Sequence, residues 1–200
     1  TNGFRVHGHA LVWHASIPSW LKSFTGTDAE FEAQVKGYIK ATVAHFALVK
    51  TADGKPVVAS WDVVNEAFTS EALAGPFYAK LGPDYVAKCF TWAKEANSEV
   101  KLFYNDYNLD SQTSKVTSVV DMVSDFKKRS IPIDGIGSQM HIGYSYPDLT
   151  TISNTLSPLV GTGLLIHFSE LDMSVNRDLA LTTLTTERAN AQKEKYKSIA

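Results

Sequence analysis

The sequence has few of the features that mark specialised protein classes. Cys89 is the single cysteine among 200 residues, so an intramolecular disulfide is excluded. No apolar run approaches the roughly 18 residues that span a membrane. The 19 Lys and Arg residues nearly balance the 21 Asp and Glu residues, which argues against a polybasic nucleic-acid surface and an acidic disordered tail. With 44% apolar residues, a chain of this length can bury a large core without disulfides or metals.

Short apolar runs alternate along the chain with longer segments of helical periodicity. The runs predict strands at residues 4–13, 57–64, 100–104, 133–140 and 164–168. The helical patterns cover residues 28–50, 83–97, 111–129, 148–159 and 186–200. The runs are apolar on both faces, which is typical of a parallel sheet covered on both sides. A doubly wound sheet and a (β/α) barrel both agree with this pattern.

Polar residues follow the carboxyl end of each run, and they favour the barrel. These residues are His14, Asn65 with Glu66, the segment 105–108, Gln139 with His141, and Glu170 with Asp172. In a TIM barrel all strand ends meet around one mouth, whereas an open sheet uses only the ends near a switch point. The sequence also lacks the glycine-rich nucleotide-binding motifs. We therefore predict a TIM (β/α)8 barrel, of which this chain contains about five βα units.

Glu66 and Glu170 form the leading catalytic pair. Each comes just after a buried apolar run, so each carboxylate is held at the barrel mouth. Two facing carboxylates are what glycoside hydrolysis needs, one as proton donor and one as nucleophile. Asn65 is placed to bind a sugar hydroxyl beside Glu66, although an asparagine there also suits a cap or a turn.

A second pair combines His141 with Asp172, which could orient the imidazole toward Glu170. A rival interpretation uses His7 and His9 with this pair as zinc ligands of a metal-dependent barrel hydrolase. The sequence offers no obvious further carboxylate and histidine cluster to complete that metal site.

Among the aromatic residues, Trp13 and Tyr107 are the two that we expect to stack on sugar rings, because both lie at predicted strand ends. Several other aromatic residues suit the same role, but aromatic residues at strand ends are also common in protein cores.

Five segments together resemble glycoside hydrolase family 10, the retaining endo-β-1,4-xylanases. The segments are residues 7–14 (HGHALVWH), 61–66 (WDVVNE), 102–108 (LFYNDYN), 134–141 (DGIGSQMH) and 169–172 (SELD). Their order and spacing make the resemblance specific, and it extends over nearly the whole chain.

The resemblance implies a role for each candidate residue and a substrate, xylan or xylo-oligosaccharides. Glu66 would be the general acid/base and Glu170 the nucleophile, with carboxyl groups about 5–5.5 Å apart. The sugar subsite next to the cleaved bond would be lined by His9, Trp13, Asn65, Gln139 and His141. Tyr107 would stack on the leaving-group side, and Asp172 would orient His141. The resemblance implies no metal and no organic cofactor.

The resemblance also implies an extracellular or periplasmic protein. The chain begins at Thr1 without an initiator methionine or a signal peptide, so we expect that an upstream segment was removed or not included.

The chain departs from the family pattern at both ends. We interpret residues 1–200 as a partial catalytic barrel, the third to seventh βα units, lacking the first two strands and the last. Unpaired sheet edges promote aggregation, so we expect another chain, or segments outside this sequence, to complete the barrel. A catalytically inactive carbohydrate-binding fragment stays open as an alternative, as does activity on cellulose.

Overall fold

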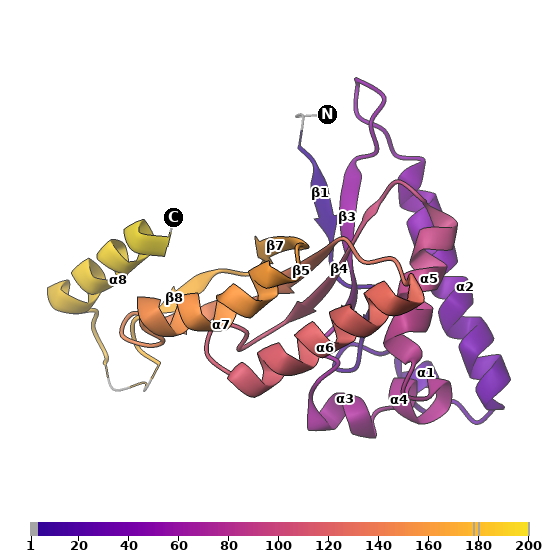
Figure 1. The fold of residues 1–200 in the computed structure, drawn as a ribbon, viewed down its shortest axis with the longest axis horizontal. Coiled ribbons are helices and arrows are strands. Elements are labelled where there is room, and N and C mark those ends of the chain that lie inside the picture. The colour runs from indigo at the N-terminus through magenta and orange to yellow at the C-terminus, as the bar shows by residue number, and fades with distance from the viewer. Residues whose placement is uncertain (1–3, 178, 180, 200) are drawn as a thin grey trace.

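One parallel sheet forms the centre of the fold, in the order β1-β3-β4-β5-β7 (Figure 1). The computed structural model describes residues 4–177, 179 and 181–199. The strands are β1 (Val6–Gly8), β3 (Val58–Asn65), β4 (Lys101–Asp106), β5 (Gly135–Ser138) and β7 (Leu165–Phe168), and a short β2 (Val12–Trp13) also pairs with β3. All these pairings are parallel, and each of the five predicted runs overlaps a strand of this sheet. The architecture is therefore an incomplete TIM barrel of five parallel strands.

The helices that follow the strands agree with the periodic segments to within a few residues. They are α2 (Asp28–Ala47), α5 (Tyr85–Ala96), α6 (Thr113–Arg129), α7 (Leu149–Gly161) and α8 (Thr186–Ile199). α2 begins with a capping box, in which the Thr27 side chain accepts from the Glu30 amide and the Glu30 carboxylate accepts from the Thr27 amide. α7 continues through Gly161, two residues beyond the predicted end.

The structure differs from the sequence expectations at three kinds of position. The first run is not one strand but two, β1 and β2, which both pair with β3. The run predicted at 133–140 ends at Ser138, and a further strand β6 (His141–Gly143) pairs with β8 (Asp172–Ser174). Three short helices were not predicted: α1 (Ser19–Lys22), α3 (Ser70–Ala74) and α4 (Pro76–Leu81). They are too short to show a helical period.

The main hydrophobic core lies between the sheet and helices α2, α5 and α6. Phe31 and Ile39 from α2, Cys89 and Phe90 from α5, and Val119 from α6 are fully buried in it. Because Cys89 is part of this core, burial raises the pKa of its thiol. The lone cysteine is therefore a packing residue.

The two edges of the sheet expose apolar side chains. Phe4 and Val6 lie at the β1 edge, and Leu165 and Phe168 lie at the β7 edge, with exposed fractions from 41% to 74%. Figure 1 shows α8 standing apart beyond β8, and none of the described residues of α8 is buried. Among the described residues, no helix combines the length and apolar character needed to cross a membrane.

Candidate active site

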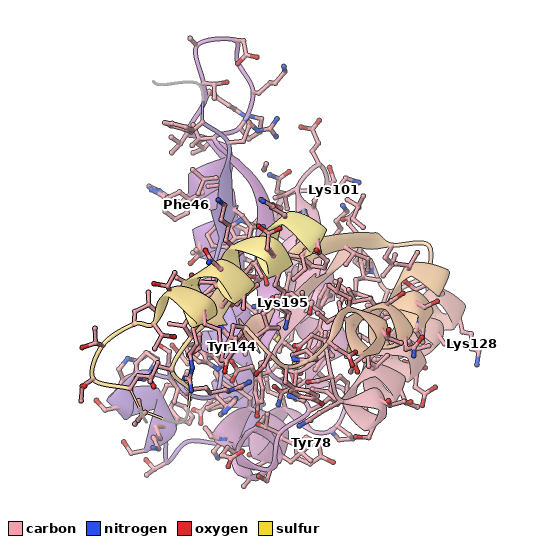
Figure 2. All side chains as sticks on the ribbon, turned by 90° about the vertical axis from the view of Figure 1, so that its left-hand side faces the viewer. Phe46, Tyr78, Lys101, Lys128, Tyr144 and Lys195 are labelled. Carbon is pink, nitrogen blue, oxygen red and sulfur yellow. The ribbon has the colours of Figure 1, made fainter. Side chains whose placement is uncertain are left out.

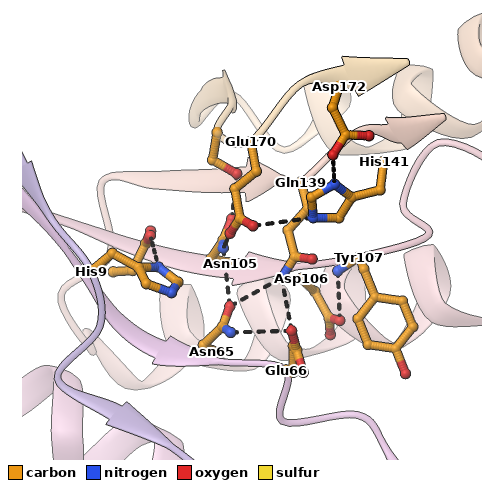
Figure 3. Close-up of polar contacts among 12 residues, drawn as sticks. His9, Asn65, Glu66, Asn105, Asp106, Tyr107, Gln139, His141, Glu170 and Asp172 are labelled. Carbon is orange, nitrogen blue, oxygen red and sulfur yellow. Dashed lines mark hydrogen bonds and ion pairs between the residues drawn. The ribbon is translucent and has the colours of Figure 1, made fainter. Parts of the chain in front are cut away.

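Glu66 directly follows β3, an inner strand of the sheet, and its carboxylate accepts three hydrogen bonds. Figure 3 draws those from Asn65 and Gln139. Trp13 Nε1 donates to Oε2 at 3.0 Å, while Asn65 Nδ2 at 3.2 Å and Gln139 Nε2 at 3.0 Å donate to Oε1. The Glu66 backbone is left-handed, with φ 58°, and its amide donates to the Asn105 carbonyl at 2.9 Å. The side chain is thus held both through its backbone and through its carboxylate.

Glu170 lies just past the edge strand β7 and is held by two side chains. Asn105 Nδ2 donates to its Oε1 at 2.8 Å, and His141 Nε2 lies 3.1 Å from its Oε2. On the other side of the ring, His141 Nδ1 lies 2.7 Å from Asp172 Oδ2. Partial burial lowers the pKa of His141. The contacts with Asp172 and, to a smaller degree, with Glu170 outweigh this effect and raise the pKa of His141 above its ordinary value. The imidazolium form donates a hydrogen bond to each carboxylate.

Asn105, which the sequence did not single out, connects the surroundings of the two glutamates. Besides donating to Glu170, Asn105 Nδ2 donates to Asn65 Oδ1 at 3.0 Å. Gln139 Nε2 donates to the same Asn65 oxygen at 3.3 Å. Its Oδ1 accepts from Ser169 Oγ at 2.6 Å. Gly137 makes room for it, since a Cβ there would lie 2.2 Å from Asn105 Oδ1. Its position at a strand end is the only signal of this role in the sequence.

Asp62 is a second residue that the sequence reasoning missed. It is buried inside β3, and its carboxylate lies 2.9 Å from His7 Nε2 and 2.9 Å from His9 Nδ1. Burial opposes its charge, but the two histidines hold the pKa of Asp62 below its ordinary value. The bond to Asp62 raises the pKa of His9, burial opposes this, and the nearby glutamates support it. His7 Nδ1 also lies 2.6 Å from Ser60 Oγ.

Two aromatic side chains lie at the same mouth. The Trp13 ring centroid is 6.0 Å from that of His9, with the rings tilted edge to face. Tyr107 follows β4, and its ring centroid is 3.3 Å from Lys115 Nζ. Figure 3 shows His9 and Tyr107 on opposite sides of Glu66. The structure thus brings all nine predicted residues to one region, at the carboxyl ends of the strands.

The described residues provide no ligand set for the zinc site of the rival interpretation. Within the described part of the chain, no group of three or more His, Cys, Asp and Glu side chains is arranged to hold a metal ion. His7 and His9 instead share Asp62 as a partner, and His141 lies between two other carboxylates.

Comparison with known proteins identifies the relatives of this chain. The sequence model of glycosyl hydrolase family 10 matches residues 1–200. Endo-beta-1,4-xylanase Xyn10C from Cellvibrio japonicus is 38% identical over 98% of this chain and 34% of that protein. Endo-1,4-beta-xylanase B from Thermotoga neapolitana is 35% identical over 86% of this chain and 48% of that protein.

Solved structures give the same relationship. Native xylanase10C from Cellvibrio japonicus superimposes with a TM-score of 0.85 over 96% of this chain and 42% of that chain, at 38% sequence identity. A mutant of that enzyme, solved in complex with xylopentaose, gives a TM-score of 0.84 at 38% identity over 96% of this chain and 40% of its own. The chain spans about a third to a half of the length of these relatives.

Proposed function

Because the chain belongs to glycosyl hydrolase family 10, we propose that it carries the catalytic centre of an endo-1,4-β-xylanase. The reaction is retaining hydrolysis of β-1,4-xylosidic bonds in xylan and xylo-oligosaccharides. The observation that supports it most directly is the pair Glu66 and Glu170. They follow β3 and β7 of one sheet and are connected by the hydrogen-bonded amides of Asn65 and Asn105.

In the first step, Glu170 attacks the anomeric carbon while Glu66 gives its proton to the leaving oxygen. The glycosidic bond breaks and a glycosyl ester of Glu170 forms. In the second step, Glu66 takes a proton from water, the water oxygen attacks the anomeric carbon, and Glu170 leaves as a carboxylate. Asn105 and His141 both contact the Glu170 carboxylate, and these two contacts hold it in place as the nucleophile.

The remaining predicted residues have binding or orienting roles in this proposal. Asn65, with its amide at the base of the site, binds a sugar hydroxyl next to the cleaved bond, and Gln139 supports Glu66. His9, Trp13 and His141 line the same sugar subsite. Tyr107 stacks on the leaving-group sugar, and Asp172 orients His141.

We also propose that segments outside residues 1–200, or another chain, complete the barrel. Besides the apolar strand edges, a cavity of about 310 Å³ beside β2 supports this. Trp20 and Tyr38 line that cavity and are 57% and 53% exposed, which is unusual for aromatic side chains beside a core.

We further propose that the enzyme acts outside the cytoplasm, in the extracellular space or periplasm, because a polysaccharide chain is too large to enter a cell intact. One structural neighbour is titled an intracellular xylanase, from Thermoanaerobacterium saccharolyticum. Fractionation of the source cells, with activity measured in each fraction, would decide this; activity confined to the cytoplasm would contradict the proposal.

The central test measures reducing-sugar release from xylan, with cellulose as a second substrate, by the active protein and by Glu170→Gln. We expect the substitution to lower the rate at least about a thousandfold, because the amide of glutamine cannot form the glycosyl ester. Proton NMR of the first products should show the β anomer. Binding of xylan without any hydrolysis by the unmodified protein would favour the inactive carbohydrate-binding alternative. Loss of activity with EDTA would favour the metal-dependent hydrolase.

A further inference from the structure

A buried ion pair lies behind the site and has no part in the mechanism above. Lys115, from α6, reaches the β4 residue Asp106, with 2.8 Å between Lys115 Nζ and Asp106 Oδ1. The two side chains are 7% and 0% exposed. Removing both charges from water costs several kcal/mol per ion, and a buried pair often stabilises a protein no better than apolar residues of similar volume. Stability alone is therefore a weak reason for this pair.

The ion pair is connected by hydrogen bonds to the backbone beside Glu66. The Tyr104 hydroxyl donates to Asp106 Oδ2 at 2.5 Å and accepts from the Ala67 amide at 3.0 Å. Tyr104 is fully buried, so no solvent can replace either bond. Asp106 thus fixes the direction of the Tyr104 hydroxyl, and that hydroxyl fixes the peptide that follows Glu66.

The peptide after Glu66 needs such a partner. Glu66 has φ 58°, a left-handed conformation that is unfavourable for an L-residue other than glycine. Its own amide is held by the Asn105 carbonyl at 2.9 Å, and the Ala67 amide is held by Tyr104. Both amides that flank this unusual residue are therefore bound to β4, which aims the Glu66 side chain into the site.

The same ion pair also holds Tyr107. Its backbone amide donates to Asp106 Oδ1 at 2.8 Å, and Lys115 Nζ lies 3.3 Å from the centre of its ring. A cation at this distance attracts the ring face. Asp106 and Lys115 therefore fix two parts of the site at once, the strand end with Glu66 and the aromatic ring proposed to contact the leaving-group sugar.

We propose that Tyr104, Asp106 and Lys115 are positioning residues that aim the general acid Glu66 and align Tyr107 on the leaving-group side. This inference rests on the proposed function. It predicts that the network matters for protonating the leaving group and not for attack by Glu170, because its contacts lead to Ala67 and Tyr107.

The test compares Tyr104→Phe with the unmodified enzyme, as the complete active protein, on two substrates. One is a xylo-oligosaccharide, whose leaving group needs a proton. The other is 2,4-dinitrophenyl β-xylobioside, whose leaving group departs without one. General acid catalysis contributes about 10²- to 10⁴-fold, so a misaimed acid should lower kcat/KM at least about tenfold on the first substrate. On the second, kcat/KM should change less than about threefold. Equal losses on both substrates, or no loss on either, would overturn the inference.

A control variant, a second variant of the network and a measurement independent of activity complete the test. Tyr78→Phe is the matched control, because Tyr78 packs against the same core but forms no side-chain hydrogen bond among the described residues. It should leave both kcat/KM values unchanged. Lys115→Met should repeat the substrate-dependent loss through Asp106.

Hydrogen exchange of the Ala67 amide should be at least about tenfold faster in Tyr104→Phe, because the amide loses its acceptor. Unchanged exchange would contradict the positioning role directly. If the unmodified protein cleaved neither substrate, the proposed function itself would fail, and that result differs from every outcome that concerns only Tyr104.

Discussion

The two glutamates face one site from parts of the molecule that are built differently. Glu66 follows β3, whose residues are buried at all positions but one and which has strand neighbours on both sides. Glu170 follows β7, whose four residues are exposed or half-buried and which lies at the edge of the sheet. The side chain of Glu170 is 32% exposed, and that of Asp172 is 64% exposed.

This difference shows two ways of holding a carboxylate. On the β3 side, strand pairing and core packing fix the backbone, and the network behind Glu66 fixes its unusual φ. On the β7 side, β7 itself is not buried, and a small apolar cluster that includes Met140, Ile142 and Met173 packs beneath β6 and β8. The Glu170 carboxylate is oriented by polar contacts from Asn105 and from the His141 and Asp172 pair.

α8 supports the second side by polar contacts as well. Lys195 Nζ donates to the carbonyls of Gly143 at 2.7 Å and Pro147 at 2.5 Å, and Gln192 Nε2 donates to the Met173 carbonyl at 2.6 Å. Gly143 ends β6 and Met173 is in β8, the two strands that carry His141 and Asp172. Figure 2 shows α8, the helix that carries Lys195, in front of the rest of the fold.

Asn105→Ala should have the largest effect, because Asn105 connects the two sides. The substitution removes a donor from Glu170 and one from Asn65, so kcat/KM on xylo-oligosaccharides should fall about a hundredfold. Asn154→Ala, at an exposed position of α7, is the control and should be neutral. A loss below about threefold would mean that the two sides are positioned independently.

Gly137→Ala should disturb the same connection by steric pressure. An added Cβ would lie 2.2 Å from Asn105 Oδ1, so the free energy of unfolding should fall by about 1–3 kcal/mol in urea titrations. Gly37→Ala, in α2 with open space around it, should instead raise the free energy of unfolding by about 0.5–1 kcal/mol. Equal stability of the two variants would show that Asn105 moves aside without penalty.

Lys195→Met tests whether α8 supports the β7 side. Two carbonyls lose a charged donor, so the local free energy of opening of α8, from hydrogen exchange, should fall by about 1–2 kcal/mol. Lys197→Met removes an equal charge from the solvent face of the same helix, where Lys197 forms an ion pair with Glu194 and with no other described residue. That control should stay within about 0.5 kcal/mol. Similar changes in both variants would refute a specific role for Lys195.

Asp172→Asn should have the smallest effect, since the His141 and Asp172 contact is largely exposed. The raised pKa of His141 means that the pair stabilises the fold fully below the ordinary histidine pKa, and that this contribution is lost as pH rises through the raised value. The substitution should lower the pKa of His141, measured by NMR titration, and move that loss to lower pH. Asp121→Asn, on exposed α6 surface, should leave the titration unchanged.

Much of the fold and of the site follows from local features of the sequence. Apolar runs bounded by polar residues predict the strands of the sheet, and the spacing of Val116, Val119 and Val123 predicts α6. Glu66 and Glu170 could be chosen because each follows its own apolar run and a pair of such carboxylates suits glycoside hydrolysis. The run before Glu170 is nevertheless exposed or half-buried in the structure, and not buried as predicted. The short helices α3 and α4 could not be predicted, because their stability comes from Thr69 and Pro76 at their starts and from packing.

The residues that sequence reasoning missed are those whose role depends on distant partners. In the sequence, Asp62 looks like an ordinary polar residue within an apolar run. Its partners His7 and His9 belong to a different strand region, and His9 is 53 residues away along the chain. Lys115 belongs to a helix whose pattern would place a lysine in solvent, yet its ammonium group contacts the buried carboxylate of Asp106.

The sequence by itself determined the class of fold, the family and the chemical groups at the strand ends, because hydrophobic periodicity and residue type are local properties. Only the tertiary structure decided how those groups are held. Parallel pairing brings residues such as Asn65, Asn105 and Gln139 within hydrogen-bond distance although they are far apart along the chain. Polar contacts orient both carboxylates, but the position of a strand inside the sheet or at its edge sets how far packing fixes the backbone beneath each one. Strand order is not written in any single segment.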